Sequence, residues 1–370
     1  MPKRILLIAG TRPNFIKLAP LYHRLKKYVD EFQIFICHTG QHFDFNMSDI
    51  FWQNLQLPAP DFHLKIKGNN VPDTIGKTIL GVNDILELHQ FDLVIVFGDV
   101  NATAAGAIAA AQSQIPVMHV EAGLRSFDRT MPEEINRIIT DHVSDYLMVS
   151  EPSGMKNLEH EGFDKNKILL VGNVMIECLL NTKKLWQSAK LPDSLVNFAK
   201  LKPAVATFHR PENVDDKENL ERVTEILTTL SVTMPIIFPV HPRTRVQLEK
   251  NNLLEILEQN KKIVLTGPLS YFEFLKLISS ASIVITDSGG IQEETSFLNI
   301  PCITFRNNTE RPVTLEIGTN NLLSIWDKDC FCKIDMHRHY VENRKKNIIP
   351  LWDNSVSQRI VDFILQKLSN

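Results

Sequence analysis

Short apolar runs alternate along the chain with longer amphipathic stretches. Runs such as LVIVF and SIVIT present apolar residues to both faces, which is typical of parallel strands covered by helices. Strand and helix in repeated alternation predict a doubly wound α/β fold. We expect strands at 4–9, 32–38, 93–97, 117–120, 146–149, 168–171, 204–207, 235–238, 263–265, 283–286 and 301–305. Helical spacing is found at 15–28, 74–89, 103–114, 272–279 and 356–368.

The alternation breaks between 173 and 203, where a helical stretch and a polar segment contain no strand pattern. At 370 residues, the chain is also longer than one ordinary core supports. We therefore predict one Rossmann-like domain over 1–173 and a second over 174–354. A final helix occupies the remaining residues, 355–370.

Composition excludes several classes of protein. A hydrophobic fraction of 44% with 22% charged residues fits a globular chain, and a net charge of −3 argues against nucleic acid or an anionic membrane as partner. No apolar run reaches the roughly 18–20 residues that cross a bilayer, and the one near the N-terminus is too short for a signal peptide. The five cysteines, odd in number, fit reduced thiols of a cytoplasmic protein.

A cysteine pair near the C-terminus invites a metal-site interpretation. Cys330 and Cys332 are followed by His337 and His339, but this is not the spacing of a standard zinc site. We expect that segment to be polar and irregular, and we predict no metal. The chain also lacks the G-x-G-x-x-G fingerprint of nicotinamide binding, so we predict no cofactor.

Two glycine-containing turns follow predicted strands, at the edge where open α/β sheets bind ligands. In IAGTRPNF, Arg12 offers a cation beside a helix N-terminus, although the motif alone favours an ordinary turn between strand and helix. In ITDSGGIQEE, Ser288, Gly289 and Gly290 would let a phosphate approach backbone N–H groups at the start of a helix.

The same motif carries two acids. We place Glu293 and Glu294 in the first turn of the helix that follows, where a carboxylate suits ribose hydroxyls better than phosphate. The alternative is a pair of acids favoured there by the helix dipole.

Three acids and a histidine stand at or near strand ends in both predicted sheets: Asp99, Glu121, Glu133 and His209. Singly, each has a structural explanation, since Asp99 could cap a helix and Glu133 could be a first-turn acid. Together they indicate acid–base chemistry. His241 in PVHPRT and Arg311 in NNTERP add basic groups that fit a pyrophosphate pocket, or else belong to solvated turns.

Nine motifs occur in one order: GTRPNFIKLAP, HTGQHFDFNMSD, FGDVNAT, HVEAGLRSFDRTMPEEINRIITDHVSDY, VGNVMI, FHRPENVDD, FPVHPRT, TDSGGIQEE and NNTERPVTLEIGTN. In this set the chain resembles the bacterial and archaeal UDP-N-acetylglucosamine 2-epimerases. The resemblance runs from about Ile5 to Leu323 and is weaker from Ser324 to Trp352. Regulated members tend to have Gln-His-Arg-x-Met where this chain has 41–45, a departure that argues against activation by substrate.

The resemblance implies a glycosyltransferase-B-like fold, with a deep cleft between two Rossmann-like domains and the C-terminal helix packed back on the first. It implies acid–base roles for Asp99, Glu121, Glu133 and His209. Substrate-binding positions carried over from the family are Arg12, His241, Phe274, Ser288, Gly289, Gly290 and Glu294, to which we add Arg311. The expected ligands are UDP-N-acetylglucosamine and UDP, and we expect a homodimer.

The chemistry explains why several acids are needed. No carbonyl group acidifies carbon 2 of the sugar, so the remaining route is elimination of UDP followed by its re-addition. Inversion then requires acid–base groups on two faces. A hydrolysing epimerase, a UDP-sugar glycosyltransferase, an epimerase of 2,3-diacetamido uronic acid sugars and a non-catalytic nucleotide-binding protein remain alternatives.

Overall fold

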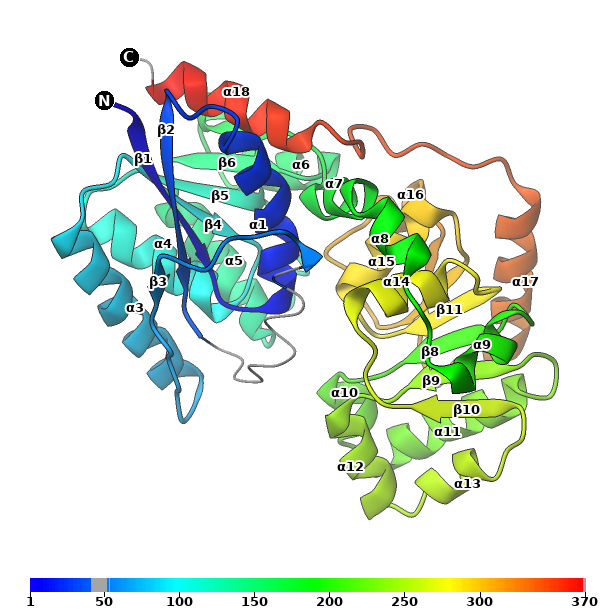
Figure 1. Ribbon diagram of the computed structural model, residues 1–370. Helices are drawn as coiled ribbons and strands as arrows, with labels where there is room; N and C mark the ends of the chain where they lie inside the picture. The colour runs from blue at the N-terminus through cyan, green and yellow to red at the C-terminus, as the bar shows by residue number, and fades with distance from the viewer. Residues whose placement is uncertain (41–51, 53, 369–370) are drawn as a thin grey trace. The chain divides into compact units, whose positions relative to one another are not determined.

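The computed structural model describes residues 1–40, 52 and 54–368 (Figure 1). It divides into two compact units, of which the first comprises Met1–Thr182 with Pro350–Asn370 and the second Lys183–Ile349. Each unit contains one parallel sheet with helices around it, which confirms the predicted α/β class of two Rossmann-like domains.

The sheet of the first unit has seven strands within the described residues, in the order β3-β2-β1-β4-β5-β6-β7. Their bounds are β1 Lys3–Ala9, β2 Phe32–His38, β3 Phe62–His63, β4 Leu93–Phe97, β5 Val117–Ala122, β6 Tyr146–Val149 and β7 Ile168–Leu170. All neighbours pair in parallel. The strand order reverses between β1 and β4, which makes the carboxyl ends of these two strands a topological switch point.

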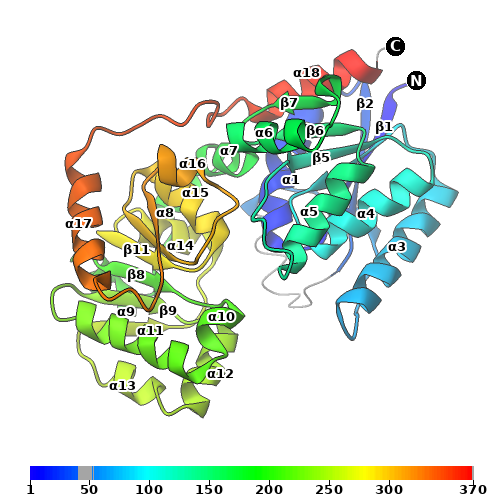
Figure 2. The same cartoon turned by 180° about the vertical axis from the view of Figure 1, so that it is seen from behind.

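Helices cover both faces of this sheet (Figure 2). One layer contains α3 (Val71–Leu88), α4 (Asn101–Gln112) and α5 (Pro132–Val143), which pack side by side. The other contains α1 (Arg12–Leu25), α7 (Val174–Asn181) and α18 (Val356–Leu368). This unit also contains α6 (Pro152–His160) and the short η1 (Lys165–Lys167).

The last helix, α18, completes the first unit by packing on α1 and α7. Its buried face includes Val356, Ile360 and Ile364. The buried carboxylate of Glu177 on α7 accepts hydrogen bonds from the backbone N–H and the hydroxyl of Ser357, both at 2.6 Å. The compact unit extends past 173, the expected boundary, to Thr182, since α7 packs on α1.

All residues of the second unit are described, and its sheet has six strands in the order β10-β9-β8-β11-β12-β13. The strands are β8 Ala204–Thr207, β9 Ile236–Pro239, β10 Ile263–Thr266, β11 Ile283–Thr286, β12 Cys302–Phe305 and β13 Asn320–Leu323. The helices are α8 Lys183–Ser188, α9 Asp193–Ala199, α10 Pro211–Val214, α11 Lys217–Leu230, α12 Pro242–Lys250, α13 Leu254–Glu258, α14 Tyr271–Ile278, α15 Gly289–Leu298, α16 Val313–Glu316 and α17 Cys330–Asn343.

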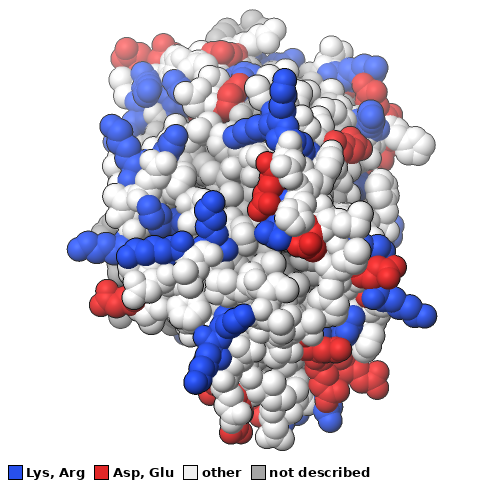
Figure 3. Space-filling view, turned by 90° about the vertical axis from the view of Figure 1, so that its right-hand side faces the viewer, with Lys and Arg blue, Asp and Glu red and all other residues white. Residues whose placement is uncertain are grey.

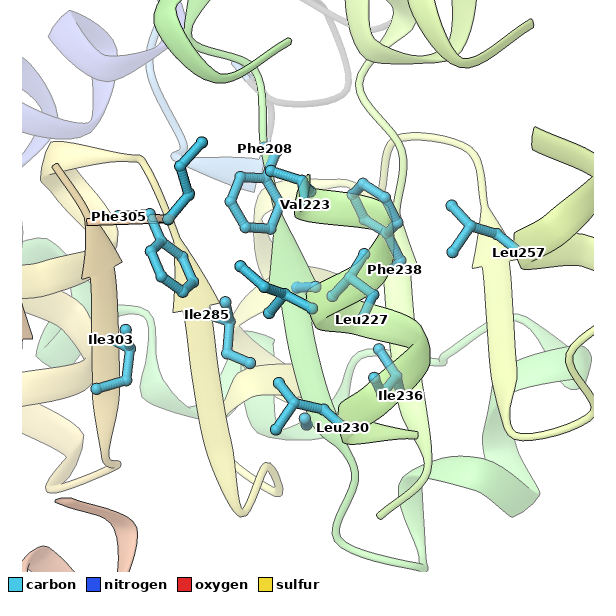
Figure 4. Packing of buried hydrophobic residues seen from close by; sticks show 14 of the residues in the cluster. Phe208, Val223, Leu227, Leu230, Ile236, Phe238, Leu257, Ile285, Ile303 and Phe305 are labelled. Carbon is cyan, nitrogen blue, oxygen red and sulfur yellow. The ribbon is translucent and has the colours of Figure 1, made fainter. Parts of the chain in front are cut away.

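The core of the second unit lies between its sheet and α11 (Figure 4). Val223 and Leu227 of α11 pack towards strand residues such as Phe238 and Ile285, all at most 1% exposed. Phe208 stacks on Phe305 with 5.9 Å between ring centroids. A chain of large apolar contacts therefore ends directly beneath the turn that contains His209.

The structure corrects the expectation for residues 330–343 and adds two strands. Residues 330–343 form a regular helix, α17, so the expectation of an irregular segment around Cys330 is wrong. All eleven expected strands are present, with ends shifted by at most two residues, and β3 and β13 are additional.

The surface and the thiols carry few distinguishing features. Lys and Arg side chains are interspersed with Asp and Glu on the face drawn in Figure 3, as the net charge of −3 leads one to expect. All five cysteines are free, and only Cys332 among them is exposed. Over the described residues, no helix combines the length and apolarity that a bilayer crossing requires.

Candidate active site

The turn after β1 lies at the switch point of the first sheet and is held rigidly by one side chain. Asn14 is 1% exposed, and its carbonyl oxygen accepts from the backbone N–H groups of Gly10 (3.1 Å) and Thr11 (3.3 Å). Its amide nitrogen donates to the carbonyl of Phe97 on the neighbouring strand at 2.8 Å. This contact ties the first residue of α1, Arg12, to the end of β4. Burial lowers the pKa of Arg12.

Asp99 follows β4 and accepts two hydrogen bonds from an arginine. Arg137 of α5 donates to Asp99 Oδ2 from Nε (3.1 Å) and from a terminal nitrogen (2.6 Å). The N-cap residue of α4 is Val100, so the structural alternative of a capping aspartate does not apply. The Asp99 side chain keeps 19% of its surface exposed, which leaves it accessible to a ligand.

Glu133 lies in the first turn of α5 and lines a cavity of about 640 Å³ within the first unit. The cavity is also lined by Thr11, Lys67, Thr74, Asp99 and Asn101, which brings Asp99 and Glu133 to one space. The adjacent Glu134 has the structural role instead. It is 1% exposed and accepts from the backbone N–H groups of Ser126 (2.9 Å) and Phe127 (3.0 Å).

Glu121 occupies a β-bulge inside β5. The pairing of β5 with β6 shifts register between Val120 and Ala122, and Glu121 has a left-handed φ of 77°. Such a conformation costs a non-glycine residue about 1–3 kcal/mol and is concentrated at functional sites. The carboxylate forms an ion pair with Lys17 of α1, and both side chains are only 4% exposed. Glu121 does not line the cavity.

In the second unit, His209 forms a pair with a buried aspartate. Its Nδ1 lies 3.0 Å from Oδ1 of Asp287. The other carboxylate oxygen, Oδ2, accepts from the backbone N–H groups of His209 and Arg210. Burial opposes ionisation of Asp287, but His209 and these N–H groups outweigh it and hold its pKa below the usual value. Since Nδ1 faces the carboxylate, Nε2 is the nitrogen left for a reacting group.

His241 stands close to this pair as the N-cap of α12. Its Nδ1 accepts from the backbone N–H of Arg243 at 3.2 Å, and its ring centroid lies 5.6 Å from that of His209. Burial first, and then the charges of His209 and Arg243, lower the pKa of His241. The imidazole therefore stays neutral at physiological pH and is able to donate from Nε2 to a ligand oxygen.

The Ser288–Gly290 turn confirms one local prediction and corrects another. Ser288 is the N-cap of α15, whose free N–H groups begin at Gly289 and Gly290. Since the helix starts at Gly289 and not at Ile291, Glu293 and Glu294 lie in its second turn, so their placement in the first turn is wrong.

Both acids are buried behind this turn. Glu293 forms an ion pair with Arg311, with 2.9 Å between Oε1 and Nε. Glu294 lies beside the hydroxyl of Tyr271, and burial, reinforced by the charge of Glu293, raises its pKa to about 8. Glu294 is therefore mostly protonated at neutral pH. Phe274, on the same helix as Tyr271, is half-buried.

Arg311 contributes through an ion-pair network. Besides Glu293 it contacts Glu310, which in turn accepts from Arg306 at 2.9 Å. A Cβ atom added at Gly289 would lie 2.7 Å from Glu310 and 2.9 Å from Arg311. A side chain at the first residue of α15 would therefore displace the side-chain ends of this network.

Sequence reasoning missed three side chains that complete the site. Lys17, Arg137 and Asp287 each hold a predicted residue: Glu121, Asp99 and His209 respectively. A charged residue in an otherwise apolar helical run was the available signal for Lys17, which stands in FIKLAP. Asp287 directly follows a buried strand, but the glycines after it drew attention away from the carboxylate.

Two doubly wound sheets, one with acids at its switch point and the other with a glycine-rich helix N-terminus, define an enzyme of the glycosyltransferase-B-like nucleotide-sugar class. The family model described as UDP-N-acetylglucosamine 2-epimerase matches residues 24–365. The UDP-N-acetylglucosamine 2-epimerase of Methanocaldococcus jannaschii is 42% identical over 86% of this chain and 88% of its own. The chain belongs to the UDP-N-acetylglucosamine 2-epimerase family, whose members are isomerases.

Solved structures that are similar to this chain come from the same family. The M. jannaschii epimerase in complex with UDP-N-acetylglucosamine and UDP superposes with a TM-score of 0.87 at 39% identity, over 98% of this chain and 99% of that one. A Pseudomonas aeruginosa UDP-2,3-diacetamido-2,3-dideoxy-D-glucuronate 2-epimerase is 38% identical over 86% of this chain and 88% of its own. The motif at 41–45 lies outside the described residues.

Proposed function

We propose that the protein interconverts UDP-N-acetylglucosamine and UDP-N-acetylmannosamine and retains UDP in the product. The observation that carries the proposal is Glu121, a buried acid held in a left-handed bulge by Lys17. Strain of this kind in a chain of this family is best explained by a role in the reaction. UDP-N-acetylglucosamine is bound in the M. jannaschii complex, a relative that aligns along nearly the whole chain.

The proposed reaction is an elimination followed by an addition. A base removes the proton on carbon 2 while the bond between carbon 1 and the UDP oxygen breaks, giving a 2-acetamidoglucal and UDP. The UDP oxygen then adds to carbon 1 as carbon 2 takes a proton on its opposite face. No net oxidation occurs, and water is not consumed. Two acid–base groups are needed because the proton leaves from one face and arrives at the other.

We assign these groups to the first unit. Asp99 and Glu133 line its cavity, and Glu121 is the last residue but one of the neighbouring strand, β5. Lys17 fixes the position of the Glu121 carboxylate through an ion pair. Arg137 does the same for Asp99. Arg12 stands at the start of α1, where helix dipole and guanidinium both favour the negative charge that develops on the departing UDP.

We assign UDP binding to the second unit. The N–H groups of Gly289 and Gly290 at the start of α15 suit a diphosphate, and neutral His241 can donate to it. We assign to His209, which Asp287 orients, a contact with or proton transfer to a phosphate oxygen. A protonated Glu294 can donate to a ribose hydroxyl as well as accept from one, and half-buried Phe274 offers a face for the uracil ring.

Isotope exchange tests the reaction. Purified enzyme incubated with UDP-N-acetylglucosamine in deuterated water, without added metal or nicotinamide, should give UDP-N-acetylmannosamine carrying deuterium at carbon 2. Nuclear magnetic resonance reads both the configuration and the label. Product without label would contradict the elimination, and free N-acetylmannosamine with UDP would indicate a hydrolysing epimerase instead.

Two finer points accompany the proposal. A related diacetamido-glucuronate epimerase makes the uronic acid substrate a second candidate, which the same assay decides when both sugars are offered. We also propose a cytoplasmic homodimer that supplies cell-surface polysaccharide synthesis. The free cysteines support a reducing compartment, and sedimentation of the purified protein tests the dimer.

A further inference from the structure

A network of charged side chains lies beside the bulge that contains Glu121 and is buried at its inner end. His119 and Asp141 are 0% exposed, and Nδ1 of the histidine lies 2.6 Å from Oδ1 of the aspartate. The second oxygen of Asp141 contacts Arg125 at 2.7 Å, and Arg125 donates through a fork to Glu161 at 2.8 and 2.7 Å. None of these four residues has a part in the reaction as proposed above.

Both nitrogens of His119 face acceptors. Nδ1 meets the carboxylate of Asp141, and Nε2 meets the backbone carbonyl of Gly98 at 2.8 Å. Burial opposes ionisation of Asp141, but the neighbouring His119 and Arg125 outweigh it and lower its pKa. The ring of His119 thus bridges Asp141 of α5 and the backbone directly after β4.

The pair connects the two turns that carry the reacting acids. The Gly98 carbonyl directly precedes Asp99 at the end of β4. Oδ2 of Asp141 accepts at 3.1 Å from the backbone N–H of Gly123, which comes two residues after Glu121. The pair of His119 and Asp141 therefore fixes the backbone directly before Asp99 and two residues after Glu121.

The bulge needs such an anchor. Side chains alternate between the faces of a regular strand, so residues 119 and 121 would both point towards the layer that contains α5. Glu121 instead contacts Lys17 of α1, in the opposite helix layer, because its left-handed φ of 77° interrupts the alternation. A backbone in this conformation persists only where its surroundings over-determine it.

We propose that His119 and Asp141 are positioning residues, which hold the Glu121 bulge and the Asp99 turn in one fixed relation by hydrogen-bonding Gly98 and Gly123. The inference rests on the proposed function for its catalytic readout but not for its structural one. Neither side chain touches the substrate. Loss of the pair releases Glu121 from its bulge and lowers turnover without changing the affinity for UDP, which the second unit binds.

Two substitutions each keep one of the two hydrogen bonds of His119 and remove the other. In His119→Asn, the side-chain amide takes the position of Nδ1 and keeps the hydrogen bond to Asp141. In His119→Gln, the amide takes the position of Nε2 and keeps the hydrogen bond to the Gly98 carbonyl. We expect each to lower kcat by about 10–100-fold with KM within about twofold of the wild type. Asp141→Asn provides a third variant, which keeps an acceptor for Gly123 but removes the charge. The Kd for UDP, from calorimetry, should be unchanged in all three.

Glu161→Gln is the matched control. It breaks the same network at its outer end, where Glu161 is 25% exposed, and touches neither turn. It should lower Tm by an amount comparable to the histidine variants and retain wild-type kcat. Equal kcat losses in Glu161→Gln and His119→Asn would overturn the proposal, since general destabilisation would then explain both.

Crystal structures of His119→Asn and His119→Gln distinguish a failure of this inference from a failure of the proposed function. If Glu121 keeps its left-handed φ and its contact with Lys17 in both, the positioning role is wrong, whatever reaction the wild type performs. If Glu121 moves while the wild type shows no epimerase activity, the positioning role stands and the proposed function falls.

Discussion

At the scale of single residues, Glu121 tests the proposed chemistry most directly. Glu121→Gln retains size and hydrogen bonding but removes the ability to transfer a proton. Turnover should fall by about 10²–10⁴-fold, the usual contribution of a positioned acid or base, while calorimetric affinity for UDP stays unchanged. Glutamine leaves Lys17 without its charged partner, so a modest drop in Tm is expected as well. Near-normal turnover of the folded fraction would remove Glu121 from the reaction.

Glu294 makes a prediction about stability and pH. Its pKa is about 8 in the folded chain against 4.5 ordinarily, so the folded state binds a proton that the unfolded state has lost between these pH values. Stability therefore falls with rising pH across that window, by up to roughly 1.4 kcal/mol per pH unit for this group. Glu294→Gln should lose this dependence and become the more stable protein towards pH 8.

Urea unfolding at several pH values between 5 and 9 measures the effect. Glu316→Gln, which changes an exposed acid on α16, is the control and should follow the wild-type profile. If the wild type and Glu294→Gln show parallel profiles, Glu294 is ionised in the folded protein, and its proposed role as a donor to the ribose is wrong.

Residue-level prediction from sequence succeeded where a side chain follows a strand and failed where its partner comes from elsewhere. Asp99 and His209 were found because strand ends converge at one edge of a sheet. Arg137 and Asp287 were missed because they are 38 and 78 residues away from the groups they hold, and no local pattern records such a pairing. The bulge at Glu121 was also hidden, since HVEAG reads as an ordinary strand end.

At the scale of elements, two glycines with similar backbone conformations allow the cost of a left-handed φ to be measured apart from the cost of a steric clash. Gly172, after β7, and Gly162, after α6, both have left-handed φ values, of 91° and 84°. A Cβ at Gly172 would lie 2.0 Å from the carbonyl oxygen of Leu351, whereas at Gly162 nothing lies within 4 Å. Gly162→Ala should cost about 1–2 kcal/mol, for the conformation alone. Gly172→Ala should cost at least twice as much, because the segment before α18 must move.

Thermal and urea unfolding of both variants measure these costs. Equal losses would mean that the Leu351 segment adapts freely and does not hold α18 in place.

Strand prediction followed hydrophobic patterning closely, and the two strands that it missed lack that pattern. β3 has two residues, Phe62 and His63, which is too short for any periodicity. β13 reads NNLL, and its buried Asn320 is stabilised by hydrogen bonds with Thr304 and Gln292 rather than by apolar burial. α17 has buried residues only at Cys330, Ile334 and Val341, so its sequence gives little helical signal.

At the scale of the whole molecule, the second unit is continuous in sequence and has its own sheet and core. A fragment of residues 183–349 should therefore fold alone and bind UDP within about tenfold of the intact enzyme, a loss of about 1.4 kcal/mol or less. Circular dichroism reports its folding, and calorimetry its affinity. A folded fragment that does not bind UDP would place essential nucleotide contacts in the first unit.

The discontinuity of the first unit has a consequence for how the chain is made. Synthesis proceeds from the N-terminus, so the whole second unit is translated before α18. Until α18 is made, α1 and α7 lack the apolar helix that covers them, and Glu177 lacks Ser357. A premature stop before α18 would therefore leave an apolar face of the first unit open, although the second unit is complete in sequence. Chaperones and proteases recognise such exposed apolar surface, so we expect this truncated product to be retained or degraded.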